Sequence, residues 1–76
     1  MRNKNMRDML VHVYSGRGNV EKSEVIVTDN LMKAYPLGLK MMDAHMGRLE
    51  HGEDMVMEVI DAKSGNTMLR DHRTLK

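Results

Sequence analysis

One segment of this chain has helical periodicity, and that segment limits the possible folds more than any other feature. Its apolar residues recur at intervals of three or four, which places them on one face of a helix. These residues are Leu31, Tyr35, Leu39, Met42, Met46 and Leu49. A chain of only 76 residues buries about 60% of its unfolded surface, so this helix must share one small core with other elements.

Short apolar runs rich in β-forming residues lie on both sides of this segment. Residues 9–14 and 24–28 have this pattern and are separated by the turn-forming residues 15–19, so they predict a first hairpin. Residues 54–60 and 67–72 have the same pattern and predict a second hairpin. We therefore predict an α+β fold of order ββαββ, in which an antiparallel sheet carries one main helix packed on one face.

The limits of the main helix follow from one proline and one glycine. Proline is destabilising inside a helix and well tolerated in its first turn, so we expect the helix to begin near Pro36, after a short turn at residues 30–34. Gly52 is expected to end the helix, because glycine readily adopts the left-handed conformation found just past a helix.

We expect the chain to form a single domain over residues 1–76, because it is too short for a second core. Its ends, residues 1–7 and 73–76, are expected to be flexible. The first eight residues contain no apolar run, so neither a secretory signal nor a membrane span is expected. The absence of cysteine is compatible with the cytosol, and we predict a cytoplasmic protein.

Alternation along the strands divides their side chains into two sets. The set expected beneath the helix contains Met9, Val11, Val13, Val25, Val27, Met55, Met57, Val59 and Leu69. The opposite set also contains apolar residues, which are Leu10, Tyr14, Ile26, Val56 and Ile60. Because one helix covers only one face of a sheet, this second cluster indicates an interface with another protein chain. Simple partial exposure of these side chains is the alternative interpretation.

Ten methionines, with no cysteine, tryptophan or phenylalanine, supply much of the apolar surface. Methionine is flexible and polarizable, which suits surfaces that adapt to a partner. We expect Met42, Met46, Met55 and Met57 in the core, whereas Met32 and Met41 fall off the helical stripe and are candidates for an exposed rim. A chain this short without disulfides is usually stabilised by a partner or by oligomerisation, so a homodimer is also expected.

Charge is unevenly distributed along the chain. Residues 50–61 contain five acidic residues and no lysine or arginine, and we expect Glu50, Glu53 and Asp54 to form an electrostatic contact with a partner. Basic residues near the ends and in the first turn are candidates for binding nucleic acid. They are Arg2, Lys4, Arg7, Arg17, Arg70 and Arg73. Only two aromatic residues are available for stacking bases, which makes nucleic-acid binding the second hypothesis.

Catalytic and metal-binding patterns are weak in this sequence. The histidines are scattered and do not have the spacing of a metal site; they are His12, His45, His51 and His72. A carboxylate followed two residues later by a lysine, as in Asp61 and Lys63, occurs in metal-dependent nucleases, with Asp54 as a second ligand. Because this match is short, a nuclease is the third hypothesis. We expect no enzymatic activity and no cofactor.

In length, in its hairpin, helix, hairpin order and in its lack of an enzyme motif, the chain resembles the small accessory proteins of bacteriophages and mobile elements, which include anti-CRISPR proteins. No individual residue carries this resemblance. It implies a non-catalytic protein that binds a host protein and blocks it. The leading hypothesis is therefore a protein-binding module that acts as an inhibitor or adaptor.

Overall fold

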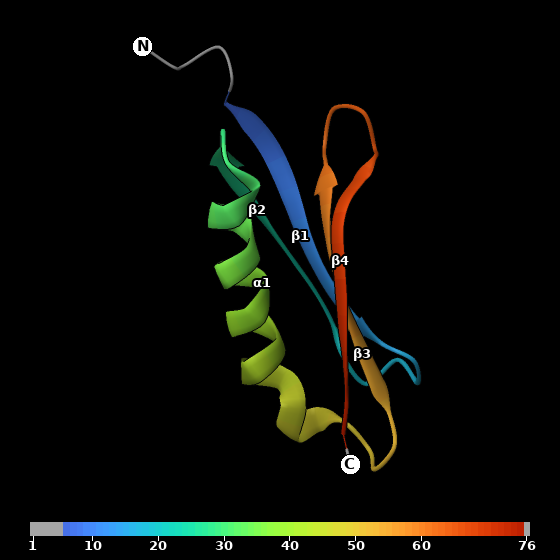
Figure 1. Ribbon diagram of the computed structural model, residues 1–76. Coiled ribbons are helices and arrows are strands. Elements are labelled where there is room, and N and C mark those ends of the chain that lie inside the picture. The colour runs from blue at the N-terminus through green and yellow to red at the C-terminus, as the bar shows by residue number, and fades with distance from the viewer. Residues whose placement is uncertain (1–5, 76) are drawn as a thin grey trace.

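The protein is an α+β domain with the predicted ββαββ order (Figure 1). A computed structural model describes residues 6–75. Its elements are β1 (Arg7–Ser15), β2 (Glu21–Thr28), α1 (Leu31–His45), the short 3-10 helix η1 (Met46–Arg48), β3 (Asp54–Asp61) and β4 (Thr67–Thr74). The four strands form one antiparallel sheet in the order β2-β1-β3-β4. The two hairpins are thus joined in the middle of the sheet by β1 and β3.

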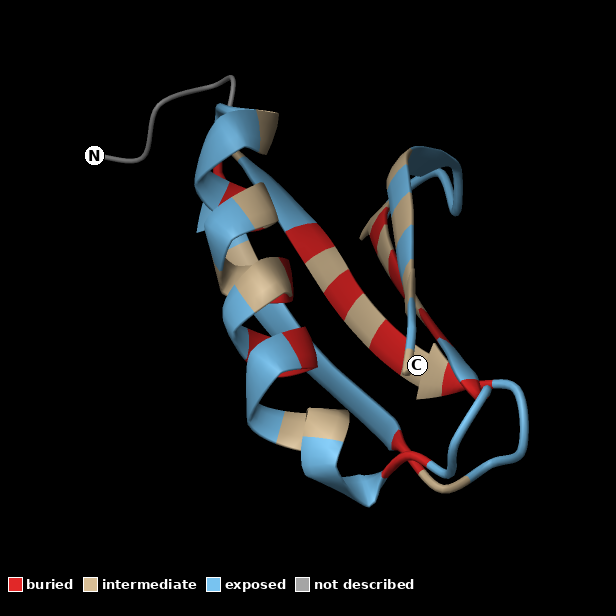
Figure 2. Ribbon diagram, turned by 60° about the horizontal axis from the view of Figure 1, so that its bottom comes forward, coloured by how far each residue is buried: buried red, intermediate tan, exposed pale blue. Residues whose placement is uncertain are grey.

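The central strands alternate between buried and half-buried residues, as Figure 2 shows along β1. Helix α1 lies on one face of the sheet, which we call the helix face, and the buried residues of β1 and β3 point towards it. The opposite face, which we call the outer face, has no element of residues 6–75 packed on it. This arrangement follows from the sequence, because one helix can cover only one face of a sheet.

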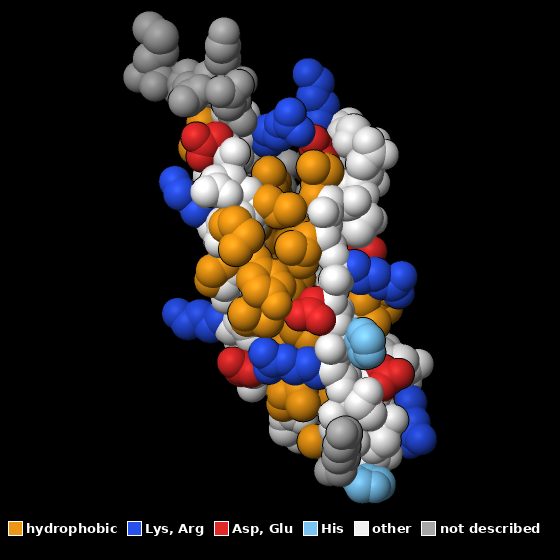
Figure 3. Space-filling model, viewed as in Figure 1, with side chains coloured by type: hydrophobic (Ala, Val, Ile, Leu, Met, Phe, Trp, Pro, Cys, Tyr) orange, Lys and Arg blue, Asp and Glu red, His pale blue; other side chains and the backbone are white. Residues whose placement is uncertain are grey.

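Helix α1 contacts β1, β2 and β3 more extensively than β4. Apolar side chains gather in the seam between α1 and β4 (Figure 3). Two polar contacts span this seam. The Tyr35 hydroxyl donates a hydrogen bond to Asp71 Oδ2 at 2.9 Å, and Arg73 forms an ion pair with Asp43. The hydrogen bond from Tyr35 lowers the pKa of Asp71. These contacts attach the edge strand β4 to the helix.

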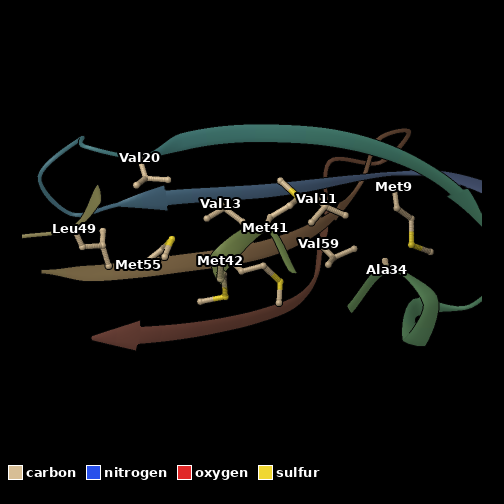
Figure 4. Packing of buried hydrophobic residues seen from close by; sticks show 11 residues of the cluster. Met9, Val11, Val13, Val20, Ala34, Met41, Met42, Leu49, Met55 and Val59 are labelled. Atoms are coloured by element: carbon tan, nitrogen blue, oxygen red, sulfur yellow. The ribbon is translucent and has the colours of Figure 1, made fainter. Parts of the chain in front are cut away.

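The core lies between α1 and the sheet, where side chains from β1, β3 and the helix point towards one another (Figure 4). Its buried apolar residues are Met9, Val11, Val13, Val20, Ala34, Met41, Met42, Leu49, Met55, Met57 and Val59. Gly38 lies where the helix packs against β3, because a Cβ atom there would lie 2.7 Å from Met57 Sδ. Glycine at this position lets Met57 pack against the helix without displacement.

The helix begins five residues earlier than the sequence predicted, so the prediction that it starts near Pro36 is wrong. Asn30 is the N-cap residue, and its side-chain oxygen accepts a hydrogen bond from the Met32 backbone N–H at 2.9 Å. This capping bond supports a first turn before the proline. Pro36 lies inside α1 on its exposed side. Because proline has no N–H, the carbonyl of Met32, four residues earlier, receives no helical hydrogen bond, and Met32 is itself exposed.

The expected role of Gly52 as the end of the helix is also wrong. Helix α1 ends at His45 and continues as η1, after which Leu49 is extended. Gly52 does have the predicted left-handed backbone, with φ of 82°, but it forms the turn that leads into β3. Its N–H donates to the Leu75 carbonyl at 2.7 Å, which anchors this turn to the residue after β4.

Strand β2 has the opposite orientation from the one predicted. Ile26 lies opposite Met9 on the helix face, whereas Val25 lies opposite Leu10 and points to the outer face with Val27. The cause is the register of the first hairpin, which pairs Tyr14 with Glu21. Because alternate residues of a strand point to opposite faces, this register fixes the orientation of every residue in β2.

Three residues from the ends that were predicted to be flexible, Arg7, Arg73 and Thr74, lie in strands. Arg7 begins β1, and β4 extends to Thr74, so the ladders of the sheet include these residues. Residues 1–5 and 76, which were also predicted to be flexible, lie outside the described residues.

Candidate functional site

The outer face carries the apolar residues that α1 does not cover. Leu10, Tyr14, Val56 and Ile60 are half-buried on the central strands. Val25 on the edge strand β2 is 62% exposed, and Val27 is 45% exposed. Several apolar side chains gathered on one sheet face mark a binding site more often than scattered single residues do. The outer face is therefore the candidate site.

The strand register organises the outer face into bands that run across the sheet. One apolar band contains Val25, Leu10 and Ile60 on β2, β1 and β3. A second apolar pair, Tyr14 and Val56, lies at a different level of the same central strands. Between these bands is a polar row of four residues, one from each strand, which are Ser23, His12, Glu58 and Arg70. The surface thus alternates apolar, charged and apolar bands.

Local contacts hold the polar row in place. The rings of His12 and Tyr14, two residues apart on β1, have centroids 5.0 Å apart and a tilt of 33°. Glu58 Oε2 accepts a hydrogen bond from the Thr67 hydroxyl at 3.5 Å. Side chains directly opposite each other in neighbouring strands interact, so the order His12, Glu58 and Arg70 places a negative charge between two basic groups.

Four of the five apolar residues predicted to form an interface lie together on the outer face, and they are Leu10, Tyr14, Val56 and Ile60. The fifth, Ile26, is a correction, because it lies on the helix face and packs against the core. Val25 and Val27 take its place. The sequence run Glu24 to Thr28 has apolar residues of both parities, so alternation alone could not orient this strand.

The structure gives Glu53 an internal role, which corrects its predicted place in an exposed electrostatic contact. Its side chain is buried, with 2% of the residue exposed. Its carboxylate accepts hydrogen bonds at 2.9 Å from the Arg17 N–H, the Asn19 amide and the Glu50 N–H. Burial alone would raise the pKa of Glu53, but these bonds and one from Ser15 lower it to about 2. Glu53 therefore fastens the first hairpin loop to the turn before β3.

The other two acidic residues predicted at the interface are exposed. Glu50 forms an ion pair with Arg17, with 2.5 Å between Oε2 and Nη1. Asp54 lies at the end of the outer face, where it hydrogen-bonds to Thr74. Only Asp54 therefore belongs to the same face as the apolar bands.

The four described basic residues that were proposed to contact nucleic acid are dispersed, and each lies beside a carboxylate. Arg7 pairs with Asp61, with 3.3 Å between Nη1 and Oδ2. Arg17 and Arg73 pair with Glu50 and Asp43, and Arg70 lies opposite Glu58. Arg2 and Lys4 lie outside the described residues.

The pattern that suggested a nuclease does not converge in the fold. Asp54 and Asp61 are the first and last residues of β3, so their Cα atoms are about 23 Å apart at about 3.3 Å per residue. Asp61 also accepts hydrogen bonds from Arg7 and from the Lys63 N–H. Within residues 6–75 no three histidine, aspartate or glutamate side chains gather as a metal site would require.

No protein family, no curated protein sequence and no solved structure matches this chain. In the part of the chain that the structure describes, α1 is too short and too polar to cross a membrane.

Proposed function

We propose that this protein is a non-catalytic protein-binding module whose outer face is buried against another protein chain. The observation that carries the proposal is the set of apolar bands on a sheet face that no element of residues 6–75 covers. Leu10 and Ile60 lie on the two central strands of this face, and Val25 extends their band to the edge strand. Their burial would release ordered water and favour association.

The chemistry of the face defines the partner it fits. Such a partner presents apolar surface at two levels, with opposite charges facing the row that contains His12, Glu58 and Arg70. The resemblance to small phage accessory proteins extends the proposal to an inhibitor or adaptor role. Nucleic-acid binding has less support, since the described basic candidates lie next to carboxylates.

Two matched lysine substitutions test whether the outer face binds a protein. Val25 on the outer face and Met32 on α1 are 62% and 65% exposed, so Val25→Lys and Met32→Lys make the same change of charge at similarly exposed sites. Affinity capture from nuclease-treated lysate should retain a stoichiometric protein partner, or a second copy, with the wild type and with Met32→Lys. Val25→Lys should weaken that association.

Equal capture by both variants would contradict the proposal, because the outer face would then not be the binding surface. Ile60→Lys provides a second test on a central strand, where the loss should be larger than at Val25 on the edge strand. Amide spectra of all variants would show that each remains folded.

A further inference from the structure

We propose that the occupant of the outer face is a second copy of this chain, packed sheet against sheet around a two-fold axis that runs parallel to the strands between β1 and β3. This inference rests on the proposed function and names the partner. The outer face is complementary to itself in this one arrangement. Two-fold homodimers are the commonest oligomers, and their interfaces require a surface of this kind.

The strand order determines what such an axis brings together. With the axis between β1 and β3, the order β2-β1-β3-β4 places β1 of one copy over β3 of the other. In the same way β2 of one copy lies over β4 of the other. Residues that are paired across the four strands form one level of the sheet, and each level then faces the same level of the second copy. The sheets would be about 10 Å apart, with their strands within about 30° of each other.

The apolar bands match in this arrangement. Leu10 faces Ile60 of the second copy, because these residues share one level of β1 and β3. Tyr14 faces Val56 of the second copy for the same reason. Every such contact occurs twice, because the axis repeats it.

The charges also match. His12 faces Glu58 of the second copy, since the two residues lie opposite each other in the β1–β3 ladder. At the edges, Glu21 of β2 shares a level with His72 of β4, so it faces His72 of the second copy. The polar row therefore pairs His12 with Glu58 at the centre of the interface and Ser23 with Arg70 at its edges. The central pair of a basic and an acidic group fixes the alignment of the two copies.

The other possible face-to-face axis lies across the strands and is disfavoured by the same row. That axis would place β1 over β1 and would bring each residue of the central row against its own copy. His12 would then face His12, Glu58 would face Glu58 and Arg70 would face Arg70. The Glu58 pair and the Arg70 pair would bring like charges together, which destabilises an interface, so the charge pattern selects the axis parallel to the strands.

The size of the face fits a weak dimer. The strands have eight or nine residues, so each is about 26 to 30 Å long, and four strands span about 19 Å. The footprint is therefore about 500 Å² per copy. Two copies together reach about 1,000 Å², which is below the roughly 1,200–2,000 Å² of stable specific interfaces and in the range of transient ones. We therefore expect a dimer that dissociates on dilution.

Sedimentation equilibrium of the full chain and two charge variants tests the proposal. The wild type should form a dimer. His12→Glu places a carboxylate opposite Glu58 of the second copy, and Glu58→Lys places a cation opposite His12, so each variant alone should dimerise at least about tenfold more weakly. An equimolar mixture of the two should form a one-to-one heterodimer, because Glu at position 12 then faces Lys at position 58. Met32→Lys should dimerise as the wild type does.

The axis is tested by chemical cross-linking, since the chain has no natural cysteine. Val25 on β2 and Thr67 on β4 lie on the two edge strands, at one level of the outer face. The variants Val25→Cys and Thr67→Cys place one thiol at each position. The axis parallel to the strands places these positions over each other, about 10 Å apart. A short thiol-reactive cross-linker should therefore join the two variants in a mixture, and it should not join Val25→Cys to Glu21→Cys.

A wild type that stays monomeric at every concentration overturns the second-copy inference, as does a dimer that neither charge variant weakens. Cross-linking of Val25→Cys to Glu21→Cys in place of Thr67→Cys overturns the axis. The proposed function fails separately, when Val25→Lys and Met32→Lys capture the same protein equally. If the wild type is monomeric but Val25→Lys still weakens the capture of another protein, the proposed function stands and the partner on the outer face is not a second copy.

Discussion

The two faces of the sheet are built from similar residues but differ in what covers them. On the helix face, Val11, Val13 and Val59 are completely buried beneath α1. On the outer face, Leu10 and Ile60 are only half-buried although they lie on the same strands. Apolar character alone therefore does not make a core position. The difference shows that the outer face holds apolar surface beyond what the internal packing of residues 6–75 uses.

Methionine is divided unequally between the two faces. The core contains Met9, Met41, Met42, Met55 and Met57, whereas the outer face is built mainly from valine, leucine, isoleucine and tyrosine. Met41 was expected at an exposed rim, but it is buried against the core. The adaptable side chains thus fill space beneath a single helix. The branched and aromatic side chains of the outer face present a more rigid surface.

The largest expected effect is a loss of packing on the helix face. Met42 on α1 is completely buried, so Met42→Ala should lower the free energy of unfolding by about 2 to 5 kcal/mol, through lost transfer energy and a residual cavity. Val56→Ala on the outer face should lower it by less. Urea denaturation of dilute protein, where the monomer dominates, would measure both. Equal losses would contradict the distinction between the faces.

A smaller loss is expected where the helix approaches β3. Gly38→Ala introduces a Cβ within 3.0 Å of three Met57 side-chain atoms, and such overpacking costs about 1 to 3 kcal/mol. Alanine's higher helix propensity offsets about 1 kcal/mol of this. We expect a net loss of no more than about 2 kcal/mol by the same denaturation measurement. The control is Gly47→Ala, which has open space around it and should not destabilise the protein.

The buried carboxylate of Glu53, in the turn before β3, should make the stability of the fold depend on pH. Its pKa of about 2 in the folded protein lies below the ordinary value of 4.5. A depressed carboxyl pKa stabilises the fold above pH 4.5, and this contribution is lost as the pH falls from 4.5 towards 2. Thermal unfolding followed across this range should show the loss in the wild type and a flatter dependence in Glu53→Gln. Exposed Glu50→Gln is the control, and a similar flattening there would argue against Glu53 as the source.

The smallest expected effect is at the edge of the outer face. Val25 is 62% exposed, so Val25→Thr should change the unfolding free energy of the monomer by no more than about 0.5 kcal/mol. The same substitution should weaken association, because it removes an apolar group from the band that contains Leu10 and Ile60. Denaturation at low concentration and sedimentation at high concentration separate these two effects. Loss of monomer stability without loss of association would reverse the assignment of this residue.

Most of the fold could be predicted because its signals are local. The patterns that indicate the helix and the two hairpins each lie within a short segment of sequence, and the ββαββ order is confirmed. The orientation of β2 was missed because Val25, Ile26 and Val27 offer apolar residues to both faces, and the loop register decides between them. The early start of α1 depends on the cap at Asn30, whose effect outweighed the proline signal.

The candidate site was only partly predictable, for a related reason. Leu10, Tyr14, Val56 and Ile60 follow from the alternation of two central strands, which needs no knowledge of their pairing. The internal role of Glu53 depends on three partners from two loops that are distant in sequence. The bands of the outer face depend on register across all four strands. Sequence periodicity describes one strand at a time, so these relations required the structure.

The central position of β1 and β3 also has a consequence for how the chain folds. Each hairpin pairs strands that are neighbours in sequence, and such contacts form quickly. The β1–β3 ladder joins residues as distant as Met9 and Asp61, so its closure is the step with the largest loss of chain entropy. Substitutions in this ladder are therefore expected to slow refolding, whereas those confined to a hairpin tip mainly speed unfolding. The β1–β3 ladder, which unites the two halves of the sheet, is thus the part of the molecule expected to set the folding rate.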